Sequence, residues 1–174
     1  MNKKISKAPV IFVSGILERM EGNIKKVFLQ TRWKPKTSPM YSGLLEIPGG
    51  RINNYENVFD AIKREVKEEC GLKIIALRSS FKGELLKIDK FEQSMIFQPF
   101  ICQQVLTKKD EGLWFGFVFI CEVEGGPKMQ KDETKDPRWV SLKELEKLLD
   151  EKPESIFPHQ YQVLKYYVKN MKQS

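Results

Sequence analysis

Gly50–Leu72, with the sequence GRINNYENVFDAIKREVKEECGL, is the most densely patterned stretch of this 174-residue chain. Its spacing predicts a helix over Val58–Cys70, on which apolar residues recur along one face. Glu65, Glu68 and Glu69 then stand at positions i, i+3 and i+4, so their carboxylates share a neighbouring face. The apolar positions that we expect to be buried are Phe59, Ile62, Val66 and Cys70.

The acidic face of this helix indicates a cation site. Like charges at this spacing repel one another and destabilise a helix. Hard divalent ions such as magnesium take oxygen ligands, and they commonly bind one or two carboxylates together with substrate phosphates. The alternative is a solvated helix in which Arg64 pairs with Asp60 and Glu68.

The flanks of the helix are marked by a glycine turn and by caps. Leu45–Ile47 resembles a short strand and ends at Pro48-Gly49-Gly50, where glycine permits a close approach of other groups. Asn53 or Asn54 is the expected N-cap. Gly71 is placed to end the helix in a left-handed conformation.

This combination of strand, glycine turn and acidic helix resembles the Nudix box, the signature of Nudix hydrolases. The nine specified places of the box span 23 residues, which makes it a specific motif. The resemblance implies an α/β (α+β) fold, the Nudix-type α/β/α sandwich with a mixed β-sheet, in a single domain over residues 1–174. The matching residues are Gly50, Glu56, Arg64, Glu65, Val66, Glu68, Glu69, Gly71 and Leu72.

The resemblance also implies a reaction, the hydrolysis of a nucleoside diphosphate linked to another moiety. Water attacks a phosphorus atom, and Mg²⁺ (Mn²⁺ is the alternative) neutralises the phosphates and acidifies the water. Glu68 is the expected general base or a further metal ligand. The implied site comprises the metal ligands Glu65, Glu68, Glu69 and the Gly50 carbonyl, the catalytic residues Glu65 and Glu68, and the structural residues Glu56 and Arg64.

Three further residues are candidates for substrate binding. Arg32 is a candidate phosphate contact and Trp33 a candidate stacking surface, because the family often uses this region for substrate. Glu133, with Asp136 as the next match, lies where Nudix domains commonly carry an acidic residue before a Trp-Val segment. The ordinary alternatives are a surface arginine, a tryptophan at the edge of the core and a solvated loop.

The only indication of the substrate is the absence of residues that mark particular subfamilies. The proline typical of ADP-ribose cleavers and the tyrosine typical of diadenosine-polyphosphate cleavers are missing from their usual places after the box. The expected substrate is therefore a nucleoside triphosphate or a related nucleotide. Two alternatives stay open, a non-catalytic nucleotide-binding or regulatory domain and an RNA 5′-end pyrophosphohydrolase.

Composition limits the partners and the location. A net charge of +7 suits polyanions, but the lysines are scattered, so we do not expect nucleic acid as a partner. No apolar run is long enough to cross a membrane, and the expected location is the cytoplasm. Family analogy suggests a homodimer. The single His159 is read as structural or surface, and Cys70, Cys102 and Cys121 as unpaired core residues.

The rest of the chain alternates strand and helix patterns. Pro99 indicates an edge or a bulge in one strand, and Ser141 with Glu144 forms a capping box. The predicted strands are Pro9–Leu17, Ile24–Trp33, Lys73–Ile88 with a break at Lys82-Gly83, Ser94–Val105, Gly112–Val123 and Trp139–Val140. A hairpin turn is expected over Lys108–Gly112, and helices from Ser141 and over Tyr161–Met171.

Overall fold

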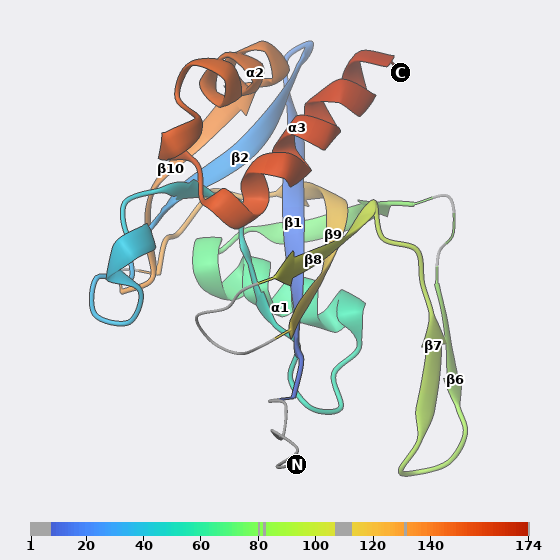
Figure 1. Cartoon of the computed structure of the whole chain (residues 1–174). Coiled ribbons are helices and arrows are strands. Elements are labelled where there is room, and N and C mark those ends of the chain that lie inside the picture. Colours follow the sequence, from blue (N-terminus) through green and yellow to red (C-terminus); the bar gives the residue numbers. More distant parts are fainter. Residues whose placement is uncertain (1–7, 80, 82, 107–112, 131, 174) are drawn as a thin grey trace.

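A mixed β-sheet forms the centre of the computed structural model, which describes residues 8–79, 81, 83–106, 113–130 and 132–173 (Figure 1). Within these residues the sheet has eight strands in the order β10-β2-β1-β9-β5, with β3 beside β2, β4 beside β1 and β8 beside β9. Strands β6 and β7 form a separate hairpin. The strands are β1 Val10–Glu21, β2 Ile24–Arg32, β3 Leu45–Glu46, β4 Gly49–Arg51, β5 Lys73–Arg78, β6 Glu84–Lys87, β7 Gln93–Ile96, β8 Ile101–Leu106, β9 Leu113–Glu124 and β10 Thr134–Ser141.

Helices cover both faces of the sheet. Helix α1, Val58–Cys70, lies on one face, whereas α2, Leu142–Glu151, and α3, Pro158–Gln173, lie on the other (Figure 1). Neighbouring residues of β1 divide between the two cores: Ile16 packs with α2 and α3, and Leu17 packs with α1. The predicted α/β/α sandwich with a mixed sheet is therefore confirmed, since β1 and β9 run parallel and the other pairs run antiparallel.

Helix α1 has the predicted bounds, but a different residue caps it. Asn57 accepts hydrogen bonds from the N–H groups of Phe59 and Asp60, so the prediction of Asn53 or Asn54 is wrong. The Asn53 carbonyl instead closes a turn with the Glu56 N–H, before the helix begins. Gly71 ends the helix with φ = 70°, as predicted.

Pro99 divides the predicted strand Ser94–Val105 into two. β7 ends at Ile96 and pairs with β6, whereas β8 begins at Ile101 and pairs with β9, so the single strand was wrong. The expected turn over Lys108–Gly112 lies outside the described residues. The strand pattern predicted over Lys73–Ile88 divides into β5 and β6 with Gly83 between them, whereas Lys82 of the predicted break lies outside the described residues. β10 extends the short Trp139–Val140 strand in both directions.

The remaining single-residue predictions gave mixed results. Cys70 and Cys121 are buried, but Cys102 is exposed, so its assignment to the core was wrong. The capping box of α2 is present, with Ser141 accepting from the Glu144 N–H. His159 packs between Tyr41 and Phe157 as an ordinary ring contact. No described helix has the length and apolar character that a membrane span requires.

Candidate active site

The glycine turn between β3 and α1 gathers two of the three predicted carboxylates. The Gly49 N–H donates to Glu69 Oε2 at 3.1 Å. A Cβ on Gly50 would lie 2.3 Å from Glu65 Cδ, which means that the Glu65 carboxyl rests directly on this glycine. The second glycine is therefore required for space: any larger residue would displace the Glu65 side chain.

Glu69 is the buried member of the acidic face. Its side chain is only 4% exposed and accepts a hydrogen bond of 2.9 Å from Gln30 Nε2 on β2. Burial, and then repulsion from Glu46, raise its pKa to about 8. Its backbone carbonyl accepts from Thr134 Oγ1 at 2.8 Å, which fixes the end of α1 to β10.

Arg64 lies across the other two carboxylates. Its Nη1 donates to Glu65 Oε1 at 2.6 Å and to Glu68 Oε2 at 3.2 Å. Burial raises the pKa of Glu65, partly offset by this guanidinium. Glu68 is more than half exposed, so the acidic face runs from a buried carboxylate, through Glu65, to one in solvent.

Arg64 also holds the loop before the helix. It forms a two-pronged ion pair with Glu56 at 2.7 and 2.8 Å, and its Nη2 donates to the Arg51 carbonyl. The hydrogen bond from Arg64 lowers the pKa of Glu56. Asp60 instead accepts from Asn57 Nδ2. These contacts place Glu56 and Arg64 where a structural role requires them.

The residues present fit a divalent cation in chemistry. The carboxylates offer hard oxygen donors, and the pKa values of Glu65 and Glu69 are raised chiefly by burial and further by the neighbouring charges of Glu68 and Glu46. Within the described ranges, no group of three or more acidic, histidine or cysteine side chains is already arranged as a metal site. A cation would therefore have to compete with Arg64 for Glu65 and Glu68, because the arginine now supplies their positive partner.

The candidate substrate-binding residues Arg32 and Trp33 both contact other side chains of the protein. Arg32 is engaged by Glu46 at 3.1 Å and stacks over Phe157 at 5.0 Å, so its guanidinium is not free for a phosphate in this conformation. Trp33 is 37% exposed and carries the Lys135 ammonium over its ring at 3.1 Å.

Glu133 is linked to the candidate site by its ion pair with Lys34. The Trp33 N–H donates to the Glu133 carbonyl, and the Glu133 carboxylate pairs with Lys34 Nζ at 2.6 Å. The charge of Lys34 offsets part of the rise that burial causes in the pKa values of Glu65 and Glu69. Glu133 therefore lies at the rim of the acidic cluster, one ion pair away from it.

Sequence reasoning missed two further buried polar residues beside Glu69, which are Gln30 and Glu46. Gln30 and Glu46 are register partners on β2 and β3, exposed by 0% and 3%. One oxygen of each, Gln30 Oε1 and Glu46 Oε1, is buried without a hydrogen-bond partner. Burial raises the pKa of Glu46 despite the neighbouring Arg32. A glutamate inside the apolar run Leu45–Ile47, directly before the glycine turn, was the available signal.

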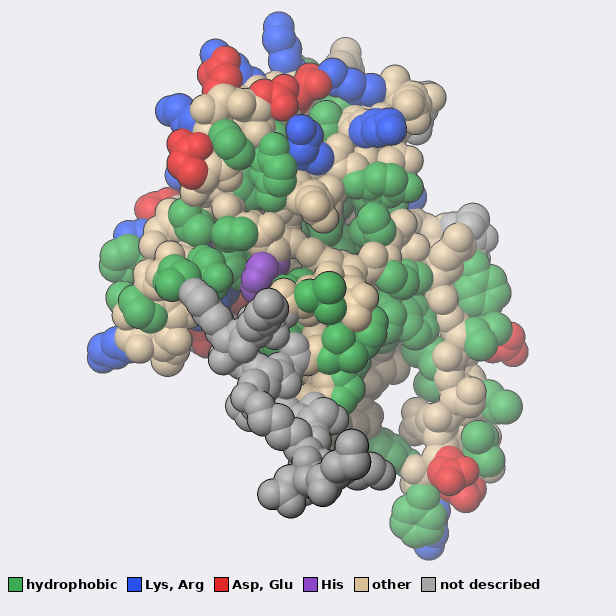
Figure 2. All heavy atoms as spheres, in the orientation of Figure 1, with side chains coloured by type: hydrophobic (Ala, Val, Ile, Leu, Met, Phe, Trp, Pro, Cys, Tyr) green, Lys and Arg blue, Asp and Glu red, His purple; other side chains and the backbone are tan. Residues whose placement is uncertain are grey.

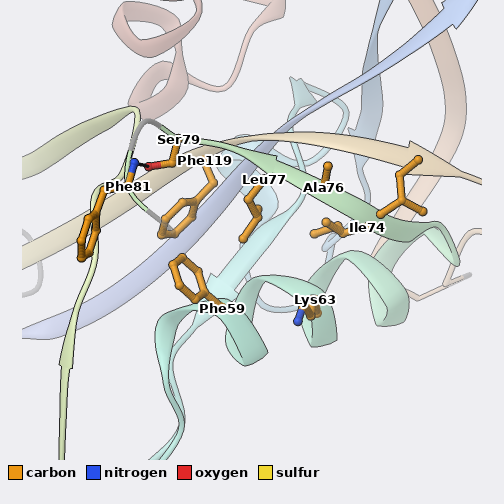
Figure 3. A pocket seen from close by; sticks show the side chains of 9 residues that line it. Phe59, Lys63, Ile74, Ala76, Leu77, Ser79, Phe81 and Phe119 are labelled. Atoms are coloured by element: carbon orange, nitrogen blue, oxygen red, sulfur yellow. Dashed lines mark hydrogen bonds between the residues drawn. The ribbon is translucent and has the colours of Figure 1, made fainter. Parts of the chain in front are cut away.

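A hollow beside α1 is not lined by these carboxylates. It has a volume of about 370 Å³ and lies between α1 and β5, where the Phe59 ring extends from the helix toward Phe119 (Figure 3). Its lining is mostly apolar, and none of Glu65, Glu68 and Glu69 belongs to it. The carboxylates of α1, rather than the residues of the hollow, therefore define the candidate site.

Comparison with known proteins agrees with this geometry. Residues 10–160 match the NUDIX domain family. The chain belongs to the Nudix family. A Methanocaldococcus jannaschii protein named ADP-ribose pyrophosphatase is 29% identical over 140 residues, which cover 80% of this chain and 66% of that protein. The predicted Nudix hydrolase acting on diphosphate bonds is thus confirmed at the level of the family.

Solved Nudix structures share the fold at low sequence identity. The MutT protein of Methanosarcina mazei Go1 superposes with a TM-score of 0.65 at 18% identity, covering 97% of this chain and 99% of that one. The NUDIX domain of Shewanella oneidensis NrtR, complexed with ADP ribose, gives 0.61 at 16% identity, covering 100% and 94%. At these identities the likeness shows the fold alone.

Proposed function

We propose that this Nudix protein is a divalent-metal-dependent pyrophosphohydrolase, which cleaves the diphosphate of a nucleoside diphosphate linked to another group. The observation that carries the proposal is the meeting of Glu65 and Glu69 on the Gly49-Gly50 turn, with Glu68 beside them at the surface. A protein that only bound nucleotides would gain nothing from crowding carboxylates where phosphates must enter, because like charges repel.

Each carboxylate has a role that its surroundings support. Glu65 and Glu69 would hold the metal together with the Gly50 carbonyl, since both rest on the glycine turn. When bound, a divalent ion supplies charge neutralisation and lowers the pKa of a bound water. Glu68 is the best candidate for accepting the proton of the attacking water, because its side chain is more than half exposed and would reach a substrate after exchanging its ion pair with Arg64.

The rim offers positive charge for the phosphates. The charge of Lys34 offsets part of the rise that burial causes in the pKa values of Glu46, Glu65 and Glu69. Arg32 would reach a phosphate only by exchanging its partner Glu46. Glu133, paired with Lys34, would be released to position water if Lys34 turned to the substrate.

Two substrates of this class have separate support. A nucleoside triphosphate or a related nucleotide is favoured by the absence of the ADP-ribose and diadenosine marks after the box. ADP-ribose is favoured by the name of the M. jannaschii relative. The products distinguish them, because a triphosphate yields a nucleoside monophosphate and pyrophosphate, whereas ADP-ribose yields AMP and ribose 5-phosphate.

The test is product analysis on a substrate panel with Mg²⁺, comparing the native protein with Glu68→Gln. We expect turnover of one panel member, reduced by about 100-fold or more in the variant. The matched control is Glu124→Gln. Glu124 is the last residue of β9, and the substitution removes an exposed carboxylate that pairs with Lys73 at the start of β5. Absence of turnover, with nucleotide binding equal in all three proteins, would establish a binding domain instead.

A further inference from the structure

Gln30 is an amide residue in the buried part of β2. It directly follows the buried apolar run Val27, Phe28 and Leu29, and its side chain has no exposed area. Amide and charged side chains are mostly exposed in folded proteins. Figure 2 shows this for the charged side chains over α2 and α3, which lie at the surface. The burial of Gln30 is an exception that calls for a physical reason.

The Gln30 amide is paired at only one of its two ends. Its Nε2 donates to Glu69 Oε2 at 2.9 Å, whereas its Oε1 is buried and meets no hydrogen-bond donor in the part of the chain that the structure describes. A buried acceptor without a donor destabilises the fold. Methionine, which is similar in length and apolar, would avoid that cost. The amide is therefore explained by its N–H group rather than by the packing of β2.

The orientation of this amide follows from the carboxylate that it meets. A flipped amide would place Gln30 Oε1 against Glu69 Oε2, and two acceptors would then face each other. Glu46, the register partner of Gln30 on β3, is only 3% exposed, so solvent offers the amide no other partner on that side. The donor is thus held on Glu69.

Glu69 receives both of its side-chain hydrogen bonds on one oxygen. Oε2 accepts from Gln30 Nε2 and, at 3.1 Å, from the Gly49 N–H. Among the described residues, no donor bonds to the other oxygen, Oε1. Two donors on Oε2 restrict the rotation of the carboxylate and occupy the lone pairs of that oxygen, so Oε1 keeps its lone pairs for another partner.

Both donors are neutral, which suits a cation site. A lysine or arginine in place of Gln30 would pair with Glu69 and cancel its charge, as Arg64 does at Glu65. An amide N–H favours the charged form of the carboxylate without adding a positive charge that would repel an incoming cation. Hydrogen bonds of this kind orient the ligands of metal sites.

We propose that Gln30 is a positioning residue for Glu69, which holds Oε2 so that Oε1 is presented to a divalent cation. The inference rests on the proposed function, because it requires Glu69 to be a metal ligand. Gln30 itself contacts neither the cation nor the substrate. It acts from β2, outside the box from which the carboxylates were predicted.

The test is a titration of the substrate-free protein with Mn²⁺, in which electron paramagnetic resonance measures the free ion. Gln30→Met removes the donor and keeps the length of the side chain. We expect its Mn²⁺ affinity to fall by about 10- to 100-fold, as it does when other metal sites lose such hydrogen bonds. Gln30→Asn keeps an amide but is one methylene shorter, so it should lose affinity as well, and it tests the same contact with a polar side chain should the methionine variant fail to fold.

Thr134→Val is the matched control. Thr134 is also fully buried and also donates to Glu69, but its Oγ1 bonds to the backbone carbonyl, at 2.8 Å. The control should keep the native Mn²⁺ affinity even where thermal unfolding with EDTA shows a loss of stability. Equal losses of affinity in Thr134→Val and Gln30→Met would reduce Gln30 to a structural role and overturn the proposal.

Glu69→Gln separates this inference from the proposed function. Affinity that falls in Glu69→Gln but stays native in both Gln30 variants overturns the positioning role and leaves Glu69 as a metal ligand. Mn²⁺ binding that Glu69→Gln leaves unchanged, or that is absent from the native protein, contradicts the metal site of the proposed function itself and the positioning role with it.

Discussion

The buried carboxyl group of Glu69 has a raised pKa, so its ionisation should change the stability of the metal-free protein with pH. Burial and the charge of Glu46 raise the folded-state pKa of Glu69 from the ordinary 4.5 of a glutamate to about 8. Between these two values the folded state binds more protons than the unfolded state, so stability falls as pH rises from about 4.5 to 8. Below that window the contribution is fully present.

Glu69→Gln should flatten this dependence, because the amide stays neutral at every pH. The measurement is thermal unfolding in the presence of EDTA at several pH values across the window. The native protein should lose stability more steeply toward pH 8 than the variant does, and added Mg²⁺ should restore stability in the native protein only. Parallel curves for the two proteins would show that Glu69 titrates normally.

Adjacent glycines in the turn between β3 and α1 have different functions. A Cβ on Gly49 would lie 2.2 Å from the Val13 carbonyl, which belongs to the backbone of β1. A Cβ on Gly50 would instead meet the end of the Glu65 side chain, which is flexible. The backbone cannot move away without disturbing the sheet, whereas a carboxylate turns at little cost.

Gly49→Ala should therefore destabilise the fold by roughly 2 kcal/mol or more, as overpacked sites do. Gly50→Ala should keep the melting temperature close to native but reduce turnover sharply, because it displaces Glu65 from the turn. Denaturation curves and kinetics measured side by side on both variants test the contrast. Equal loss of stability in the two would mean that the two positions are equally constrained.

Local patterns predicted the elements well where one pattern dominated. The bounds of α1, the Gly71 cap and the α2 capping box depended on spacing within a few residues, and each is present. The split between β7 and β8 was missed because a run of apolar residues around Pro99 looks continuous, whereas pairing with different partners ends each strand. Asn57 was missed because three nearby asparagines offer the same cap chemistry.

The candidate site was predictable only for residues within the box. Glu65, Glu68 and Glu69 follow from helical spacing. Gln30, Lys34 and Glu46 come from separate strands and loops, and only the β2–β3 register brings Gln30 and Glu46 together. Burial also gave the three glutamates different environments, from 4% exposure at Glu69 to an open side chain at Glu68, which the sequence pattern alone treats as equivalent.

At the scale of the whole molecule, a hydrogen bond to a buried carboxylate joins the C-terminal helix to the sheet. Glu18 on β1 is only 2% exposed. The Tyr167 hydroxyl on α3 donates to its Oε1 at 2.6 Å, and Arg78 on β5 pairs with its other oxygen. Lys25 on β2 adds a second cation at 3.7 Å, so residues of β2, β5 and α3 converge on this carboxylate of β1.

Tyr167→Phe tests this tie, because it removes only the hydroxyl from a ring that is 1% exposed. One oxygen of a buried carboxylate then lacks its donor, which should cost about 1–3 kcal/mol in unfolding free energy. Turnover at saturating substrate should stay native, since the contact touches none of the residues on the glycine turn. Chemical denaturation gives the first quantity and steady-state kinetics the second. A parallel loss of turnover would mean that α3 and the acidic helix are coupled through the sheet, and that the two ends of the molecule do not act independently.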